Sequence, residues 1–159
     1  MDKTQITAEP GVPLVVVTRA FAAPRDLVFR AYTEPDLLER WLGPRDLTMT
    51  VDRYEARDGG TYRYIHTAAD GTEFRFRGVF HGDPAPHAIV QTFEYEGTPG
   101  HVSLNTITLE ERDGATVVRT VSSFASLKDR DFMVESGMER GVRDAGDRLD
   151  ELLTTLRVT

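Results

Sequence analysis

The fold of this chain is decided by residues 21–44, which read FAAPRDLVFRAYTEPDLLERWLGP. They predict two short helices back to back, and Pro24 suits the first turn of the first one. The second is expected to start at Thr33, because Asp36 follows three residues later as in a capping box, and to end at Gly43. Helices at this point separate the first strand of the chain from all the others.

Segments of β character lie on both sides of this helical pair. Leu14–Phe21 precedes it, and the others are Thr48–Tyr54, Thr61–His66, Glu73–His81, Ile89–Tyr95, Val102–Glu110 and Thr116–Phe124. Asp70-Gly71 and Asp113-Gly114, in two of the intervening turns, are good hairpin signals, because glycine adopts positive φ without steric cost. Short turns of this kind predict antiparallel neighbours.

A long amphipathic helix is expected over about Lys128–Leu156, with Ser126 and Asp129 as its capping box. Its apolar stripe consists of Val134, Met138, Val142, Ala145, Leu149, Leu152, Leu153 and Leu156. Gly141 and Gly146 flank the stripe, where glycine costs up to about 1 kcal/mol relative to alanine. Either a close approach of another group or neutral drift explains them. The elements together predict an α+β fold, a curved antiparallel sheet wrapped around the C-terminal helix.

Composition and charge limit the classes of partner and site that this protein can have. The 159 residues carry a net charge of −7 without a run of Lys or Arg, which argues against a nucleic-acid partner. The absence of cysteine excludes disulfides and thiolate ligands. No segment reaches transmembrane length and the first ten residues do not resemble a secretory signal, so we expect a cytoplasmic protein without a membrane partner. We expect residues 1–12 to be a flexible leader and 13–159 a single domain.

Four motifs in order carry a resemblance. They are Trp41-Leu42-Gly43-Pro44, Gly59-Gly60, Phe76-Arg77-Gly78-Val79-Phe80 and Gly137-Met138-Glu139-Arg140-Gly141-Val142. With them the chain resembles the START-like (SRPBCC) superfamily, in the branch named after the C-terminal domain of the heat-shock-protein-90 ATPase activator, over about Leu14–Leu156. The resemblance implies a helix-grip fold with a cavity between sheet and helix. It also implies a hydrophobic ligand, since most members bind one and a minority are cyclases or other enzymes.

Two neighbouring predicted strands, Thr61–His66 and Glu73–His81, alternate aromatic rings with mostly polar side chains. The rings are expected to face the helix, because the charged side chains between them belong in water. The candidate ligand-binding residues are Trp41, Tyr62, Tyr64, His66, Phe74, Phe76, Glu135, Met138 and Val142. Such an aromatic lining suits a flat apolar ligand, and the alternative is a packed core that holds no ligand.

Three further observations bear on chemistry. Glu135, at the edge of the helix stripe, is either a ligand contact, a catalytic acid or base, or a solvated side chain. The four histidines are His66, His81, His87 and His101; they lack metal-ligand spacing, so no metal site is expected. No phosphate-binding glycine loop or dinucleotide fingerprint is present, and no cofactor is expected.

Three functions from different classes remain open. The first is a protein that binds a small hydrophobic molecule, and the more specific version of this hypothesis is an aromatic ligand. The second is an enzyme of cyclase or hydrolase type that uses His66, a tyrosine and Glu135. The third is a stress-related interaction module with a chaperone partner. In the eukaryotic co-chaperone a separate N-terminal domain engages the chaperone, whereas the START-like unit takes up nearly all of this sequence, so the third function rests on fold analogy. The oligomeric state is left open.

Overall fold

The computed structural model describes residues 3–158. The strands are β1 (Gln5–Thr7), β2 (Leu14–Phe21), β3 (Leu47–Tyr54), β4 (Thr61–Ala68), β5 (Glu73–Val79), β6 (Ile89–Tyr95), β7 (Val102–Arg112) and β8 (Ala115–Ser123). The helices are α1 (Arg25–Thr33), α2 (Pro35–Leu38), α3 (Leu127–Glu135) and α4 (Met138–Val158).

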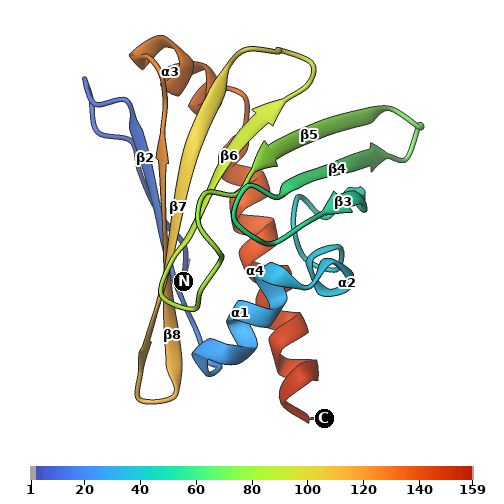
Figure 1. The fold of residues 1–159 in the computed structure, drawn as a ribbon, viewed down its shortest axis with the longest axis vertical. Helices are drawn as coiled ribbons and strands as arrows, with labels where there is room; N and C mark the ends of the chain where they lie inside the picture. The colour runs from blue at the N-terminus through green and yellow to red at the C-terminus, as the bar shows by residue number, and fades with distance from the viewer. Residues whose placement is uncertain (1–2, 159) are drawn as a thin grey trace.

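All eight strands form one antiparallel sheet in the order β1-β2-β8-β7-β6-β5-β4-β3. The sheet is strongly bent: in Figure 1, β2, β7 and β8 stand upright, whereas β4 and β5 cross the view at a steep angle. Helix α4 runs past the inside of this bend, and α1 lies beside its C-terminal half. The predicted helix-grip α+β fold is confirmed, including two short helices between β2 and β3.

The start of the chain differs from the prediction. Residues 1–12 were expected to be a flexible leader, but Gln5–Thr7 pairs with Val16–Thr18 as an edge strand. Thr4 is buried, and its carbonyl accepts a hydrogen bond from Arg143 of α4 at 2.8 Å. Three residues are too few for an alternation pattern to be visible in the sequence. The strand covers an edge of β2 that would otherwise present unpaired backbone groups.

The helix predicted over Lys128–Leu156 is two helices. α3 ends at Glu135, and Gly137 adopts a φ of 88°, which turns the chain before α4 begins at Met138. Because of this break, Val134 does not continue the buried stripe and is 39% exposed.

The two predicted helix caps have different outcomes. The Ser126 cap is confirmed, since its Oγ accepts a hydrogen bond from the Asp129 amide at 3.1 Å. The Thr33 cap is wrong: its hydroxyl donates to the Phe29 carbonyl, and α2 begins one residue later, after Glu34.

The core is concentrated around the C-terminal half of α4. Leu149 and Leu153 of this helix are 0% and 2% exposed. They belong to one cluster with α1 and the sheet, whose other members include Phe21, Val28, Ala31, Phe80, Ile89, Ile107, Leu109 and Val118. Met138 and Val142, near the start of α4, are only partly buried. The apolar face of α4 therefore packs tightly at one end and faces open space at the other.

Candidate functional site

A cavity of about 1080 Å³ lies between the concave face of the sheet and α4. Its size is at the upper end of ordinary small-molecule pockets. The structure brings eight of the nine predicted site residues to its lining: Trp41, Tyr62, Tyr64, His66, Phe74, Phe76, Met138 and Val142. The cavity is thus formed by the elements that the sequence indicated.

Glu135 is the exception. It is exposed at the end of α3 and does not belong to the cavity lining. The reason is the break at Gly137, since the prediction assumed that one continuous helix would carry Glu135 and Met138 on related faces. Of its three interpretations, the structure matches the solvated side chain.

One side of the cavity is a continuous surface of aromatic rings, which we call the aromatic wall: Tyr62, Tyr64, Phe76, Phe93 and Tyr95. Tyr62 and Tyr64 of β4 stack with ring centroids 5.9 Å apart. Phe76 of β5 lies 5.5 Å from Tyr64 and stacks on Phe93 of β6 at 5.3 Å. Phe93 and Tyr95 were not among the predicted residues; their signal is the alternation Ile89, Gln91, Phe93, Tyr95 along β6.

The tyrosine hydroxyls behind this wall are used within the fold. Tyr62 donates to the Thr92 carbonyl and Tyr54 donates to the Tyr32 carbonyl, both at 2.5 Å. Burial raises the pKa of the Tyr54, Tyr62 and Tyr64 phenols, so they stay protonated at neutral pH. The hydroxyls of Tyr54 and Tyr62 therefore fix their own rings in position.

His66 lies inside the site rather than at its rim. It is 6% exposed, and its Nδ1 is buried without a hydrogen-bond partner in the described part of the chain, residues 3–158. The imidazole meets Tyr64 and Phe76 edge-on, with centroids 5.3 and 5.4 Å apart. Burial, and then the charge of Arg148, lower its pKa to about 4. His66 is thus a neutral, partly unsatisfied polar group at the end of the aromatic wall.

The glycine before Pro44 is required by His66. Gly43 has a φ of 100°, which favours glycine, and a Cβ at this position would lie 2.3 Å from Cε1 of the imidazole. The Trp-Leu-Gly-Pro motif, which follows the end of α2 at Leu38, therefore lets the chain pass directly over the histidine ring.

Trp41 is packed in the wall of the cavity. Its side chain is 4% exposed, its Nε1 donates to the Ala31 carbonyl at 2.9 Å, and its ring meets Tyr32 edge-on at 4.8 Å. The tryptophan therefore joins α1 to the segment that follows α2.

Polar side chains line the other side of the cavity. They come from β6, β7 and β8: Gln91, Ser103, Asn105, Thr120 and Ser122. Among residues 3–158, Asn105 Oδ1 is buried without a hydrogen-bond partner. Sequence reasoning missed this group, although Ser103 and Asn105 lie on the same face of β7 as Ile107 and Leu109, because the sequence does not show which strands lie beside β7.

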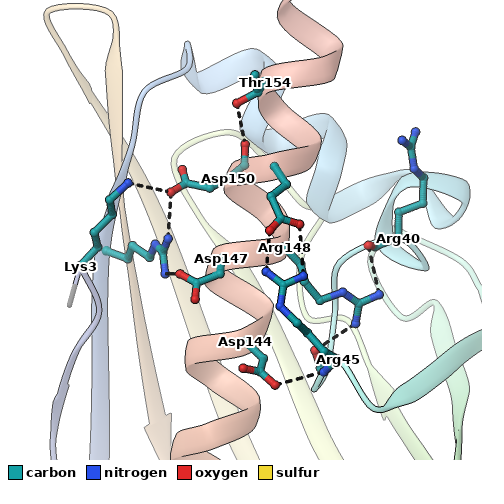
Figure 2. Close-up of polar contacts among 11 residues, drawn as sticks. Lys3, Arg40, Arg45, Asp144, Asp147, Arg148, Asp150 and Thr154 are labelled. Carbon is teal, nitrogen blue, oxygen red and sulfur yellow. Dashed lines mark hydrogen bonds and ion pairs between the residues drawn. The ribbon is translucent and has the colours of Figure 1, made fainter. Parts of the chain in front are cut away.

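Ion pairs and hydrogen bonds along α4 hold the site together (Figure 2). On one side, Arg148 donates to the carbonyls of Arg40 and Gly43, each at 3.1 Å, and Arg45 pairs with Glu151 at 2.6 Å. These contacts fasten the connection between α2 and β3 to the helix. The buried guanidinium of Arg19, on β2, pairs with Asp147 and Asp150 on the other side at 3.0 and 2.8 Å.

The remaining candidate features are His101, a metal site and a membrane span. His101 is exposed and lies 3.0 Å from Asp129. Within residues 3–158, no group of three or more His, Cys, Asp or Glu side chains is arranged to hold a metal ion. No helix in that range combines the length and apolar character needed to cross a bilayer.

Comparison with solved structures places the fold among bacterial proteins of similar size. A crystal structure of protein Ms6760 from Mycobacterium smegmatis has a TM-score of 0.86 at 27% identity, over 94% of this chain and 96% of that one. The crystal structure of a Rhodobacter sphaeroides protein has a TM-score of 0.87 at 28% identity, over 96% of this chain and 99% of that one. The solution NMR structure of a protein from Arthrobacter aurescens has a TM-score of 0.87 at 27% identity, over 95% of this chain and 91% of that one.

Sequence comparisons give the family. No curated protein matches the chain. The model of the family described as Activator of Hsp90 ATPase homolog 1-like protein matches residues 22–154, which is most of the chain and includes α1, the strands β3 to β8 and most of α4. The chain therefore belongs to this family, within the START-like superfamily.

Proposed function

We propose that this protein binds a small hydrophobic molecule with an aromatic part in the cavity between the sheet and α4. The observation that carries the proposal is the aromatic wall, which faces about 1080 Å³ of space instead of packing against the helix. Membership of the family supports a ligand-binding or co-chaperone-like module in general. The narrower class, a ligand with an aromatic part, is inferred from the rings of the aromatic wall.

The geometry of the wall suits a flat ligand. Phe76 and Phe93 are nearly parallel, with an angle of 21° between their planes, and Tyr62 and Tyr64 are inclined by 18°. Rings arranged in this way offer a face for offset stacking, worth about 0.5–1.5 kcal/mol per pair beyond the apolar area that is buried. The tyrosine hydroxyl of Tyr62 is already bonded, so the face that it presents is apolar.

Naphthalene is a suitable probe, and calorimetry together with the melting temperature gives the readout. Binding to the native state alone should raise the melting temperature as the probe concentration rises. Gly141→Leu should abolish this response while the protein stays folded, because Gly141 lines the cavity and a Cβ there meets only Pro44 Cδ, at 3.7 Å. Gly141→Ala is the matched control and should retain binding. Naphthalene binding that is unchanged in Gly141→Leu, or absent from the wild type, would overturn the proposal.

A protein-interaction role is the second candidate. It is favoured by the family description and by apolar side chains exposed on α3, where Phe132 is 60% and Leu127 39% exposed. The test is the ATPase rate of a purified heat-shock protein 90 with and without the protein. Stimulation that is lost in Leu127→Ser, at an exposed side chain outside the cavity lining, and kept in Gly141→Leu would assign this role to α3 independently of the cavity.

A further inference from the structure

The polar side of the cavity contains an ordered row of neutral side chains. Asn105 of β7 stands directly opposite Gln91 of β6 and opposite Ser122 of β8 in the strand register. All three line the cavity. We call Gln91, Asn105 and Ser122 the polar row. It crosses three adjacent strands at one level, so it forms a single patch on the floor of the cavity.

The centre of the polar row is unsatisfied. Asn105 Oδ1 is buried and accepts no hydrogen bond within the described chain, residues 3–158. A buried acceptor without a donor destabilises a folded protein, and such groups are rare in native structures. Asn105 lines the cavity and its terminal amide torsion is broad, so a turn of the amide presents Oδ1 to a donor in the cavity.

Charge indicates the kind of donor. The polar row itself carries no charge, and Arg19, the charged residue of β2 that lines the cavity, is already paired with Asp147 and Asp150. A charged ligand group placed on the row would lose its hydration, and none of the three side chains of the row offers an opposite charge. The row therefore favours a neutral O–H or N–H group.

The polar row and the aromatic wall are close enough for one small molecule to contact both. They meet on β6, where Gln91 belongs to the row and Phe93 to the wall. Residues two positions apart on a strand lie on the same face, so Gln91 and Phe93 are separated by about 7 Å. This distance is roughly the length of a fused two-ring system.

We infer that the ligand is a neutral amphipathic molecule whose aromatic part lies on the aromatic wall and whose hydroxyl or N–H group donates to Asn105 Oδ1. This inference rests on the proposed function and adds a specific polar contact to it. Asn105 is then the residue that sets selectivity between a ligand with a donor and its apolar analogue, and Phe76 contributes to affinity for both.

The experiment compares probes in which the donor hydrogen of a hydroxyl is replaced by a methyl group. 1-Naphthol and 2-naphthol carry a hydroxyl at two positions, and 1- and 2-methoxynaphthalene keep the oxygen but cannot donate. The wild type should prefer at least one naphthol over its methoxy analogue. In Asn105→Leu this preference should fall by about three- to tenfold, the range expected for one neutral hydrogen bond. Thr106→Val, a neighbour on the opposite face of β7, is the control and should keep the preference.

The outcomes separate the two proposals. If all four probes bind, Phe76→Ala weakens them equally, and Asn105→Leu leaves the preference unchanged, the inference about Asn105 is wrong while the proposed function stands. If none of the probes binds the wild type, the proposed function itself fails. Circular dichroism and melting establish that each variant folds, and Asn105→Ala replaces Asn105→Leu if the larger side chain prevents folding.

Discussion

Arg19 of β2 lies against Gly146 of α4 so closely that a Cβ at position 146 would come within 2.5 Å of its Nη1 atom. The side chain of Arg19 is 5% exposed and pairs with Asp147 and Asp150. The glycine lets the helix pass over a buried guanidinium that joins it to the sheet. Gly141 has no such neighbour, since its Cβ would meet only Pro44 Cδ at 3.7 Å. Of the two explanations for these glycines, close approach applies to Gly146.

Alanine substitutions at the two glycines should therefore change stability in opposite directions. Gly141→Ala should raise the free energy of unfolding by up to about 1 kcal/mol, because alanine is the better helix former. Gly146→Ala should lower it by about 1–3 kcal/mol despite the same gain, because Arg19 must leave its buried ion pairs. Urea denaturation of both variants measures the difference, and two changes of the same sign would contradict this account.

His66 should make the protein sensitive to mild acid. Its folded pKa of about 4 is below the ordinary value of 6.5, so between these values the unfolded chain binds a proton that the folded chain does not. The stability contributed by the neutral imidazole is present above pH 6.5 and decreases as the pH falls toward 4. The free energy of unfolding should be smaller at pH 5 than at pH 8 by about 2 kcal/mol from this group.

Denaturation at the two pH values in His66→Gln tests this expectation. The variant should lose most of the pH dependence between pH 8 and pH 5, whereas His81→Gln, a change at an exposed histidine, should retain it. Equal pH dependence in the wild type and both variants would show that His66 titrates normally.

Arg148 should influence both the stability and His66. Arg148→Met removes the hydrogen bonds to the Arg40 and Gly43 carbonyls, which should cost about 1–2 kcal/mol. It also removes the nearby positive charge, so the pKa of His66 should rise. An NMR titration of the imidazole measures the shift. Arg112→Met, at an exposed ion pair of β7, should change neither quantity.

The two ends of the α4 stripe should respond differently to truncation. Leu149 is 0% exposed, and Leu149→Ala should cost about 2–5 kcal/mol because it leaves a hole in a packed core. Val142 is partly buried beside the cavity, so Val142→Ala should cost less than about 1.5 kcal/mol. A thermal or urea measurement in which Leu149→Ala costs under about 1 kcal/mol would show that this end is not tightly packed.

Much of the sheet follows from local patterns in the sequence. The predicted strand Ile89–Tyr95 has the observed limits, and the strands that follow Asp-Gly turns lie next to their chain neighbours. The break between α3 and α4 does not follow, because three glycines occur along this region and two of them, Gly141 and Gly146, remain within the helix. Which glycine adopts positive φ depends on packing, and the incorrect placement of Glu135 results from that.

The candidate site was predictable where it depended on one strand at a time. Alternation along β4 and β5 was enough to identify Tyr62, Tyr64 and Phe76 as lining residues. Asn105 was not predictable, since its significance depends on which strands lie beside it and on the absence of a partner for its oxygen. Contacts of α4 such as that of Gly146 with Arg19 likewise join residues that no local pattern relates.

The position of β2 in the sheet has a consequence for the order in which the chain folds. Strands β3 to β8 each lie beside their neighbours in sequence, whereas β2 pairs with β8, as in Val15 with Ser122, about a hundred residues later. Closing so long a loop is entropically costly before its contacts form, and distant pairings of this kind slow folding. During synthesis, β2 must therefore wait until β8 has left the ribosome, and the cavity is completed only when α4 docks.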